Sequence, residues 1–249
     1  MVQEDGEPLR LFLRRLTTRS VLTQEECAAI LSLPGREDVV ATNRDVVSMG
    51  QQVTEACVVL DGLIGRFAET AGGERQFVEL HIPGDAADLH SVVSPQVVSP
   101  LQALTRARIL RVPHKALVKI ATEHPAIAHA FWRDSVVDAS IIAQAVLSLG
   151  RRRAIARLAH LLCEMTLRYE QIGAKREEGI NFPINQPQLA DALGLTPIHV
   201  NRMVRTLRER GVATFARGLL TVQDWDGLVA IAEFDPVYLQ FEPIDRHEP

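Results

Sequence analysis

The segment 185–222 constrains the fold of this chain most strongly, because it holds the start and stop signals of two short helices in close succession. Asn185 can cap the first helix, in which Pro187 lies in the first turn. Leu189 and Leu193 give this helix an apolar inner face. Gly194 can end it, because glycine readily adopts a left-handed backbone.

A second helix is predicted directly after this turn. Thr196 can cap it, Pro197 lies at its first position, and Gly211 ends it. Apolar residues three and four apart form its buried stripe, namely Val200, Met203, Val204 and Leu207. Two short helices joined by a tight, glycine-containing turn form a helix-turn-helix motif.

A β-hairpin follows the second helix. The apolar segments 212–215 and 219–222 flank Ala216-Arg217-Gly218, so the sequence predicts a winged helix-turn-helix with Arg217 at the tip of the wing. A cation in that place can meet a phosphate. Residues 151–217 also carry 12 Lys and Arg against 6 Asp and Glu, whereas residues 218–249 carry 1 against 7.

Hydrogen-bonding and cationic side chains occupy the outer face of the second helix. In the major groove, arginine pairs with guanine and asparagine with adenine. We therefore expect DNA contacts from Gln186, Gln188, Thr196, Ile198, His199, Asn201, Arg202, Arg205 and Arg217. The alternatives are a structural helical hairpin with a solvated cationic face, and an interaction module that does not bind DNA. The caps, the turn, the wing and the local charge together favour DNA binding.

The first half of the chain has a different pattern of apolar residues and turn signals. Residues 9–33 are predicted to be helical, with a capping box from Thr23 to Glu26 that opens a short second helix. Residues 39–113 contain short β-branched runs separated by turn signals, of which Asp61-Gly62 is a strong hairpin signal. This pattern predicts a small antiparallel barrel or sandwich.

A long helix is predicted over residues 124–149, apolar on two sides, so that it can pack on its own barrel and on a partner helix. Gly150 is expected to break it, and a new helix is expected from Arg151 to Tyr169. Residues 171–181 are predicted to be a loop and 225–234 a last helix. We expect residues 243–249 to be a disordered tail.

Two segments carry a resemblance to a known family. Gly-Arg-Arg-Arg-Ala-Ile-Ala-Arg-Leu-Ala-His-Leu-Leu (150–162) resembles the helix after the hinge of Crp/Fnr transcription regulators, and residues 188–211 resemble their DNA-binding unit. The resemblance implies an α+β fold: a β-roll, jelly-roll-like sensor domain over 1–122, a dimerisation helix and hinge over 123–150, and a winged helix-turn-helix with a C-terminal tail over 151–249. It also implies a homodimer that reads a two-fold symmetric operator, with Arg202 matching the arginine that the family uses on guanine.

The sequence departs from the best-known members at two sites of contact. Ile198 stands where many members have Glu, and His199 replaces a common Thr, so the half-site should differ from theirs. Ile198 can contact a thymine methyl group or pack on a neighbour. In the sensor domain, the phosphate cradle of cyclic-nucleotide binders is replaced by Ala87-Asp88-Leu89 and by residues 96–100, with no arginine between Arg75 and Arg106. We therefore expect no tight binding of cyclic AMP or cyclic GMP.

Three effector hypotheses remain open, in this order. The sensor binds an uncharged or hydrophobic effector, since Val92, Val93, Val97 and Val98 are apolar. Alternatively it has lost ligand control, or it responds to redox state or haem. Asp88 is a weak pocket candidate, with capping or solvent exposure as alternatives. His81 and His90 are haem-ligand candidates by position only, and we expect His81 to be an ordinary surface or hydrogen-bonded histidine. We expect Cys57 to be an inert core thiol.

Other function classes find little support. No phosphate-binding loop, G-x-S-x-G or H-E-x-x-H motif occurs, so we expect no enzyme. The three cysteines form no C-x-x-C, and we expect neither a metal nor a cofactor. The uncharged run 89–105 contains two prolines, and residues 1–5 are acidic, so we expect no membrane helix, no signal peptide and a cytoplasmic protein. RNA polymerase is a candidate partner of the acidic segment 224–249, whose simpler role is solubility.

Overall fold

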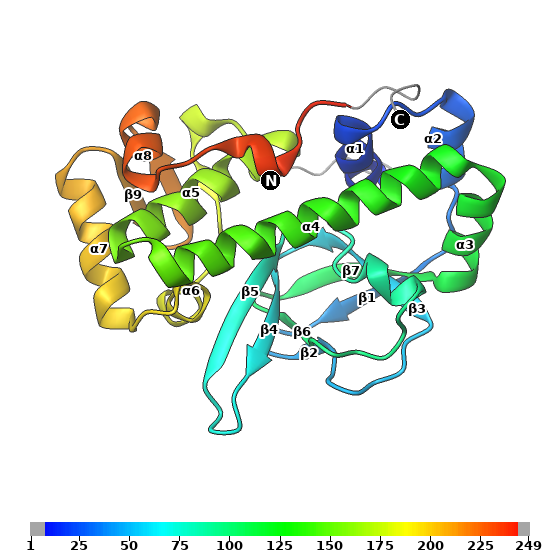
Figure 1. The fold of residues 1–249 in the computed structure, drawn as a ribbon, viewed down its shortest axis with the longest axis horizontal. Helices are drawn as coiled ribbons and strands as arrows, with labels where there is room; N and C mark the ends of the chain where they lie inside the picture. The colour runs from blue at the N-terminus through cyan, green and yellow to red at the C-terminus, as the bar shows by residue number, and fades with distance from the viewer. Residues whose placement is uncertain (1–7, 244–249) are drawn as a thin grey trace. The chain divides into compact units, whose positions relative to one another are not determined.

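The computed structural model describes residues 8–243, and it mixes helices with antiparallel sheets as expected (Figure 1). The chain divides into two compact units. The described part of the first comprises residues 8–64, 81–137 and 240–243, and the second comprises 65–80 and 138–239. Helix α4 (Pro125–Arg151) is a single long helix with residues in both units.

The first unit combines helices with short strands. Its helices are α1 (Arg10–Arg19), α2 (Gln24–Leu31), α3 (His114–Glu123), the first half of α4 and the 3-10 turn η1 (Leu89–Val92). Its strands are β1 (Arg36–Val40), β2 (Asp45–Val47), β3 (Glu55–Asp61), β6 (Leu101–Ala103) and β7 (Ala107–Pro113). Strand β7 lies between β1 and β3, and β2 pairs with β6, all antiparallel. The antiparallel architecture expected for residues 39–113 is confirmed.

The capping box at the start of α2 is present. The Glu26 carboxylate accepts from the Thr23 backbone N–H at 2.7 Å, and the Glu26 N–H donates to the Thr23 hydroxyl at 3.3 Å. These two bonds satisfy groups that no intrahelical partner can reach.

The hairpin expected at Asp61-Gly62 is wrong. Strand β3 pairs with β7, in a sheet ordered β1-β7-β3, whereas β4 (Ile64–Glu69) pairs with β5 (Arg75–His81). Gly62 does provide a turn, with φ +89°, and a Cβ there would lie 2.7 Å from the Arg106 carbonyl oxygen. The local signal therefore predicted the turn correctly, but long-range pairing decided which strand lies beside β3.

Two apolar clusters form the core of the first unit. One joins α1 and α4 to a face of β3 and β7, with Phe12 stacked on Phe131 at 6.1 Å between ring centroids. The other fills the space beside β2, β3, β6 and β7 and includes Cys57, which is buried as expected. Burial of these side chains supplies most of the driving force for folding.

A buried ionic cluster ties α1 to α4. The Arg15 Nε donates to Asp134 Oδ1 at 2.6 Å, and its Nη1 pairs with Asp85. Arg19 reaches the same Asp134 oxygen at 3.4 Å. All four side chains are almost completely buried, so each charge needs its partner.

Replacing Asp134 by Ala should leave the two arginine charges buried without their shared carboxylate. We expect a loss of about 3–5 kcal/mol in the free energy of unfolding, measured by urea denaturation. The matched control is Glu37→Ala, which removes an exposed pair with Arg108 at 3.0 Å and should cost less than about 1 kcal/mol. Equal losses in the two variants would contradict the assignment.

The second unit contains the helix-turn-helix. Its further helices are α5 (Ala154–Gln171), α6 (Gln186–Leu193), α7 (Pro197–Glu209) and α8 (Trp225–Ala232), with the 3-10 turns η2 (Arg176–Glu178) and η3 (Pro236–Leu239). Besides the β4-β5 hairpin it has β8 (Ile180–Asn181), β9 (Ala213–Ala216) and β10 (Leu219–Val222), in the order β8-β10-β9.

The helix break expected at Gly150 is wrong. Helix α4 runs through Gly150 to Arg151, and α5 starts only at Ala154. The cost of a glycine inside a helix is only about 1 kcal/mol, which a long packed helix tolerates. The chain leaves the helical conformation at Arg153, whose backbone is extended.

The predicted last helix is shorter than expected, because α8 ends at Ala232 and Glu233 adopts a left-handed conformation. The expected tail falls outside the described residues, except for Pro243. Within residues 8–243, no helix combines the length and the apolar character that a membrane span requires.

Candidate nucleic-acid interface

Helix α6 begins with a capping box. The Asn185 side chain accepts from the Gln188 N–H at 2.9 Å, and the Gln188 side chain accepts from the Asn185 N–H at 3.0 Å. Gln188 is therefore buried and engaged in the cap, whereas Gln186, one residue into the helix, is exposed. Both were predicted to contact DNA; the structure leaves only Gln186 at the surface.

The turn between the two helices has the predicted chemistry. Gly194 adopts φ +59° and ψ 43°, the left-handed conformation that ends α6. The Thr196 hydroxyl then accepts from the His199 N–H at 3.3 Å and caps α7. Thr196 is exposed, so its hydroxyl and the free end of α7 both face solvent.

The two faces of α7 are sharply different. Val200 and Leu207 are buried in the unit, whereas the opposite face exposes the side chains expected to read DNA. Exposed on that face are Ile198, Asn201, Arg202, Arg205 and Arg208, with His199 half-buried beside them. Ile198 is 82% exposed, so it does not pack on a neighbour.

Polar contacts already order part of this face. The Gln186 side chain donates to the Asn201 side chain at 3.1 Å, which places α6 and α7 groups on one surface. Arg205 pairs with Glu209 one turn on, at 2.6 Å. Both pairs are exposed, so a ligand can exchange with them at little cost.

The wing is a tight hairpin. Strands β9 and β10 pair from Ala213 and Val222 to Ala216 and Leu219. The two loop residues, Arg217 and Gly218, have φ +54° and +77°, as a type I′ turn requires. Arg217 is exposed at the tip, where the sequence placed it.

Helix α5 also carries a buried polar and aromatic cluster, which joins it to the segment after α8. The Tyr238 hydroxyl donates to Glu164 Oε2 at 2.9 Å, and Arg168 donates to Glu164 Oε1 at 3.1 Å. The His160 ring lies 5.1 Å from the Phe234 ring and stacks on Tyr238 at 5.8 Å. Sequence reasoning missed this cluster. The four-residue spacing of Glu164 and Arg168 was a signal, but nothing local points to Tyr238.

Burial governs the titration of this cluster. Removal from water, together with the nearby Arg152 charge, lowers the pKa of His160 to about 4. Burial also raises the pKa of Glu164, against the opposing effects of Arg168 and Tyr238. His160 is therefore neutral at physiological pH.

Acid should destabilise the protein through His160. Its pKa of about 4 when folded lies below the ordinary value of 6.5, so the unfolded chain binds more protons between these values. The stability from neutral His160 is present above pH 6.5 and is lost as the pH falls towards 4. Between pH 7 and pH 4.5 we expect wild type to lose about 2–3 kcal/mol more than His160→Gln, measured by urea unfolding. Parallel losses in the two proteins would contradict this.

The sensor-side candidates lie elsewhere, in the first unit. Asp88 is buried, and its Oδ1 accepts from the Cys57 N–H at 2.6 Å. Asp88 is therefore bonded to the backbone of β3. His81 is fully buried, with Nδ1 4.0 Å from Asp85 Oδ2. Of the two environments expected for it, surface or hydrogen-bonded, the surface one is therefore wrong. His90 is exposed.

The four valines proposed to receive an apolar effector do not share one environment. Val97 is buried in the second core cluster and Val92 packs beside the first. Val93 and Val98 are largely exposed. Among residues 8–243, no three His, Cys, Asp or Glu side chains converge as a metal site requires.

Comparisons with known proteins agree with this geometry. Residues 156–231 match the model of the Crp-like helix-turn-helix domain. The chain is 26% identical over 184 residues to the nitrogen fixation regulation protein FixK of Azorhizobium caulinodans, covering 74% of this chain and 73% of that protein. It is 21% identical over 210 residues to the anaerobic regulatory protein of Haemophilus influenzae, covering 84% of this chain and 81% of that one.

Solved structures show the same fold. FixK2 from Bradyrhizobium japonicum superposes with a TM-score of 0.72 at 22% identity, covering 80% of this chain and 98% of that one. A CRP-family regulator from Thermus thermophilus superposes with a TM-score of 0.63 at 18% identity, covering 79% and 97%. The match to the family model shows a Crp-like helix-turn-helix domain over residues 156–231. Together with the named relatives, the exposed face of α7 and the wing, it supports a DNA-binding transcription regulator of the Crp/Fnr type.

Proposed function

We propose that the protein acts as a homodimer that reads a two-fold symmetric operator, with α7 of each copy in a major groove. The observation that carries this proposal is the exposed first half of α7, where Ile198, Asn201 and Arg202 stand clear of the rest of the unit. An α-helix fits the major groove, and the residues at its start reach the base edges.

The chemistry of each side chain suggests its role. Arg202 can pair with guanine through two N–H groups, and Asn201 can pair with adenine once it releases Gln186. Ile198 offers an apolar contact to a thymine methyl group. Thr196, Arg205 and Arg217 can donate to phosphates, and we assign His199 and Gln186 to the edge of the contact.

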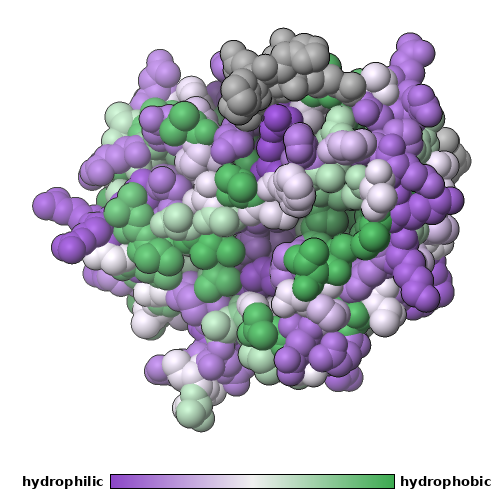
Figure 2. All heavy atoms as spheres, turned by 45° about the vertical axis from the view of Figure 1, so that its right-hand side comes forward, coloured by the Kyte–Doolittle hydropathy of each residue, from purple (hydrophilic) through white to green (hydrophobic). Residues whose placement is uncertain are grey.

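Helix α4 supplies the proposed dimer contact. Large apolar side chains along it stay exposed in the single chain, namely Trp132, Val136, Val146 and Leu147. Figure 2 shows hydrophobic side chains gathered in patches on one face of the molecule. A second copy of α4 would cover these exposed side chains of α4. We propose a functional division into a sensor domain (1–122), a dimerisation helix with hinge (123–150) and a DNA-binding domain (151–249).

The experiment that tests this function is selection of bound sequences from random duplex DNA by the purified protein. The proposal expects a symmetric site whose half-sites lie about one helical turn, about 34 Å, apart. Recovery of a single asymmetric site would contradict the homodimeric reading. Recovery of nothing sequence-specific would contradict binding without an effector.

Arg202 and Arg217 should differ in what they contribute. Arg202→Ala should cost about 1–3 kcal/mol of binding on the selected site and relax the preference at one base pair of each half-site. Arg217→Ala removes the same charge from the wing and should weaken binding to all duplexes alike. It should also reduce the slope of log affinity against log salt concentration by about one phosphate contact. Fluorescence anisotropy on matched and mutated duplexes measures both. Uniform weakening by Arg202→Ala would contradict its role in base reading.

Cyclic nucleotides should not control the protein. The turn before η1 carries Asp88 where the phosphate cradle would need donors, and Asp88 is committed to the β3 backbone. Burying a phosphate beside this carboxylate without an arginine is unfavourable. Isothermal titration with cyclic AMP and cyclic GMP should show no tight binding, and a Kd in the low micromolar range would contradict this.

A further inference from the structure

The C-terminal end of α6 is held by side chains from two other elements of the second unit. Arg157, on α5, donates through Nη1 to the Leu193 carbonyl oxygen at 2.6 Å and lies 3.5 Å from that of Gly194. Gln76, on β5, donates to the Ala192 carbonyl oxygen at 3.1 Å. The last carbonyls of a helix have no partner within the helix and carry its negative dipole end, so such donors stabilise it.

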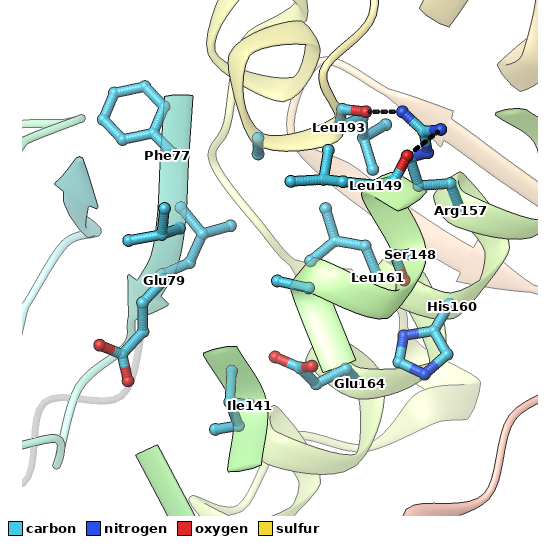
Figure 3. Close-up of a pocket in the computed structure, with 14 residues that line it drawn as sticks. Phe77, Glu79, Ile141, Ser148, Leu149, Arg157, His160, Leu161, Glu164 and Leu193 are labelled. Carbon is cyan, nitrogen blue, oxygen red and sulfur yellow. Dashed lines mark hydrogen bonds between the residues drawn. The ribbon is translucent and has the colours of Figure 1, made fainter. Parts of the chain in front are cut away.

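The same guanidinium also reaches α4. Its Nη2 donates to the Leu149 carbonyl oxygen at 3.1 Å and to that of Arg152 at 3.3 Å. Figure 3 shows the guanidinium of Arg157 beside the carbonyl oxygens of Leu149 and Leu193, with a dashed bond to each. One rigid, planar group therefore joins the end of α4 to the end of α6.

Gly194 shows how closely these parts approach. A Cβ on Gly194 would lie 2.8 Å from Leu149 Cδ2, 3.3 Å from Gln76 Oε1 and 3.5 Å from Arg157 Nη1. The turn of the helix-turn-helix thus contacts the end of α4 directly. Because Thr196 caps α7 only two residues later, the placement of this turn also sets where α7 begins.

We infer that Arg157 is a positioning residue for operator reading, which fixes the helix-turn-helix against the end of α4 and thereby selects the spacing between half-sites. This inference rests on the proposed homodimer through α4. In such a dimer the position of each recognition helix relative to its partner depends on α4 and on the contacts at the end of α4. Arg157 reads no base itself.

The chemistry of the bridge explains why arginine is needed. The acceptors on α4 and α6 are met by two different nitrogens of one guanidinium. A lysine ammonium is a single compact donor on a flexible stem, so it cannot hold both acceptors in the same fixed geometry. Burial lowers the pKa of Arg157 from its very high ordinary value, and the group stays charged.

The test uses full-length protein and duplexes that carry two copies of the selected half-site, with the separation changed in single base-pair steps. Each step rotates one half-site by about 34° and moves it by about 3.4 Å. Wild type should show one optimum and lose about tenfold or more in affinity one base pair away from it. Arg157→Met should flatten this profile to about two- to threefold, with affinity for a single half-site unchanged within about twofold.

Two further variants sharpen the result. Arg153→Met removes the same charge from the exposed start of α5, where the side chain makes no cap bond, and should keep the sharp profile. Arg157→Lys should fall between wild type and Arg157→Met. If Arg157→Met does not fold, as judged by circular dichroism and thermal melting, Arg157→Lys carries the test alone and must still broaden the spacing optimum.

Hydrogen exchange of the free protein separates this inference from the proposed function. Arg157→Met should speed exchange in both 146–153 and 193–199, without DNA and whatever the oligomeric state. A sharp spacing profile in Arg157→Met, or unchanged exchange in these segments, would overturn the inference and leave the homodimer standing. A third outcome is faster exchange in Arg157→Met while the wild-type protein shows no optimum in its affinity as the half-site spacing changes. That outcome would overturn both the homodimer and the role of Arg157 in spacing.

Discussion

The DNA-binding surface depends on how the ends of its helices are satisfied. A helix leaves unpaired N–H groups at its start and unpaired carbonyls at its end, and these must find partners elsewhere. Asn185 and Thr196 supply partners at the starts of α6 and α7. Gly194 and Arg157 provide for the end of α6. Each of these three helix ends therefore has a bonded partner, which holds the turn that leads into α7.

Each unit also has a buried ionic cluster at a junction between distant segments. Arg15 and Asp134 join α1 to α4 in the first unit. Glu164 joins α5 to the segment after α8 through Arg168 and Tyr238 in the second. Such clusters contribute little net stability relative to apolar side chains of the same size, but a charge that loses its partner is costly. The effect of these clusters is therefore mainly on which segments pack against each other, and less on the net stability of the fold.

The first unit has an antiparallel scaffold in which buried carboxylates bond to the backbone and to arginine. Asp88 accepts a backbone N–H of β3, and Asp85 serves both Arg15 and the Ile82 N–H. Of the four valines behind the hypothesis of an apolar effector, two face solvent, Val97 belongs to the core and Val92 packs beside it.

The sequence alone determined the features whose causes are local. The caps at Thr23, Asn185 and Thr196, the left-handed Gly194 and the wing turn at Arg217 follow from residue chemistry within a few positions, because each bond closes over three or four residues. The winged helix-turn-helix, and the exposure of most of the side chains predicted to contact DNA, were predictable for that reason.

Only the tertiary structure decided the contacts between distant segments. The pairing of β3 with β7, the burial of His81, the bond from Tyr238 to Glu164 and the bridge from Arg157 to Leu149 and Leu193 have no local signature. A turn signal states that the chain reverses, but the strand beside it is chosen by long-range burial and hydrogen bonding. A side chain's partner across a fold depends on where whole elements pack, which no short window of sequence contains.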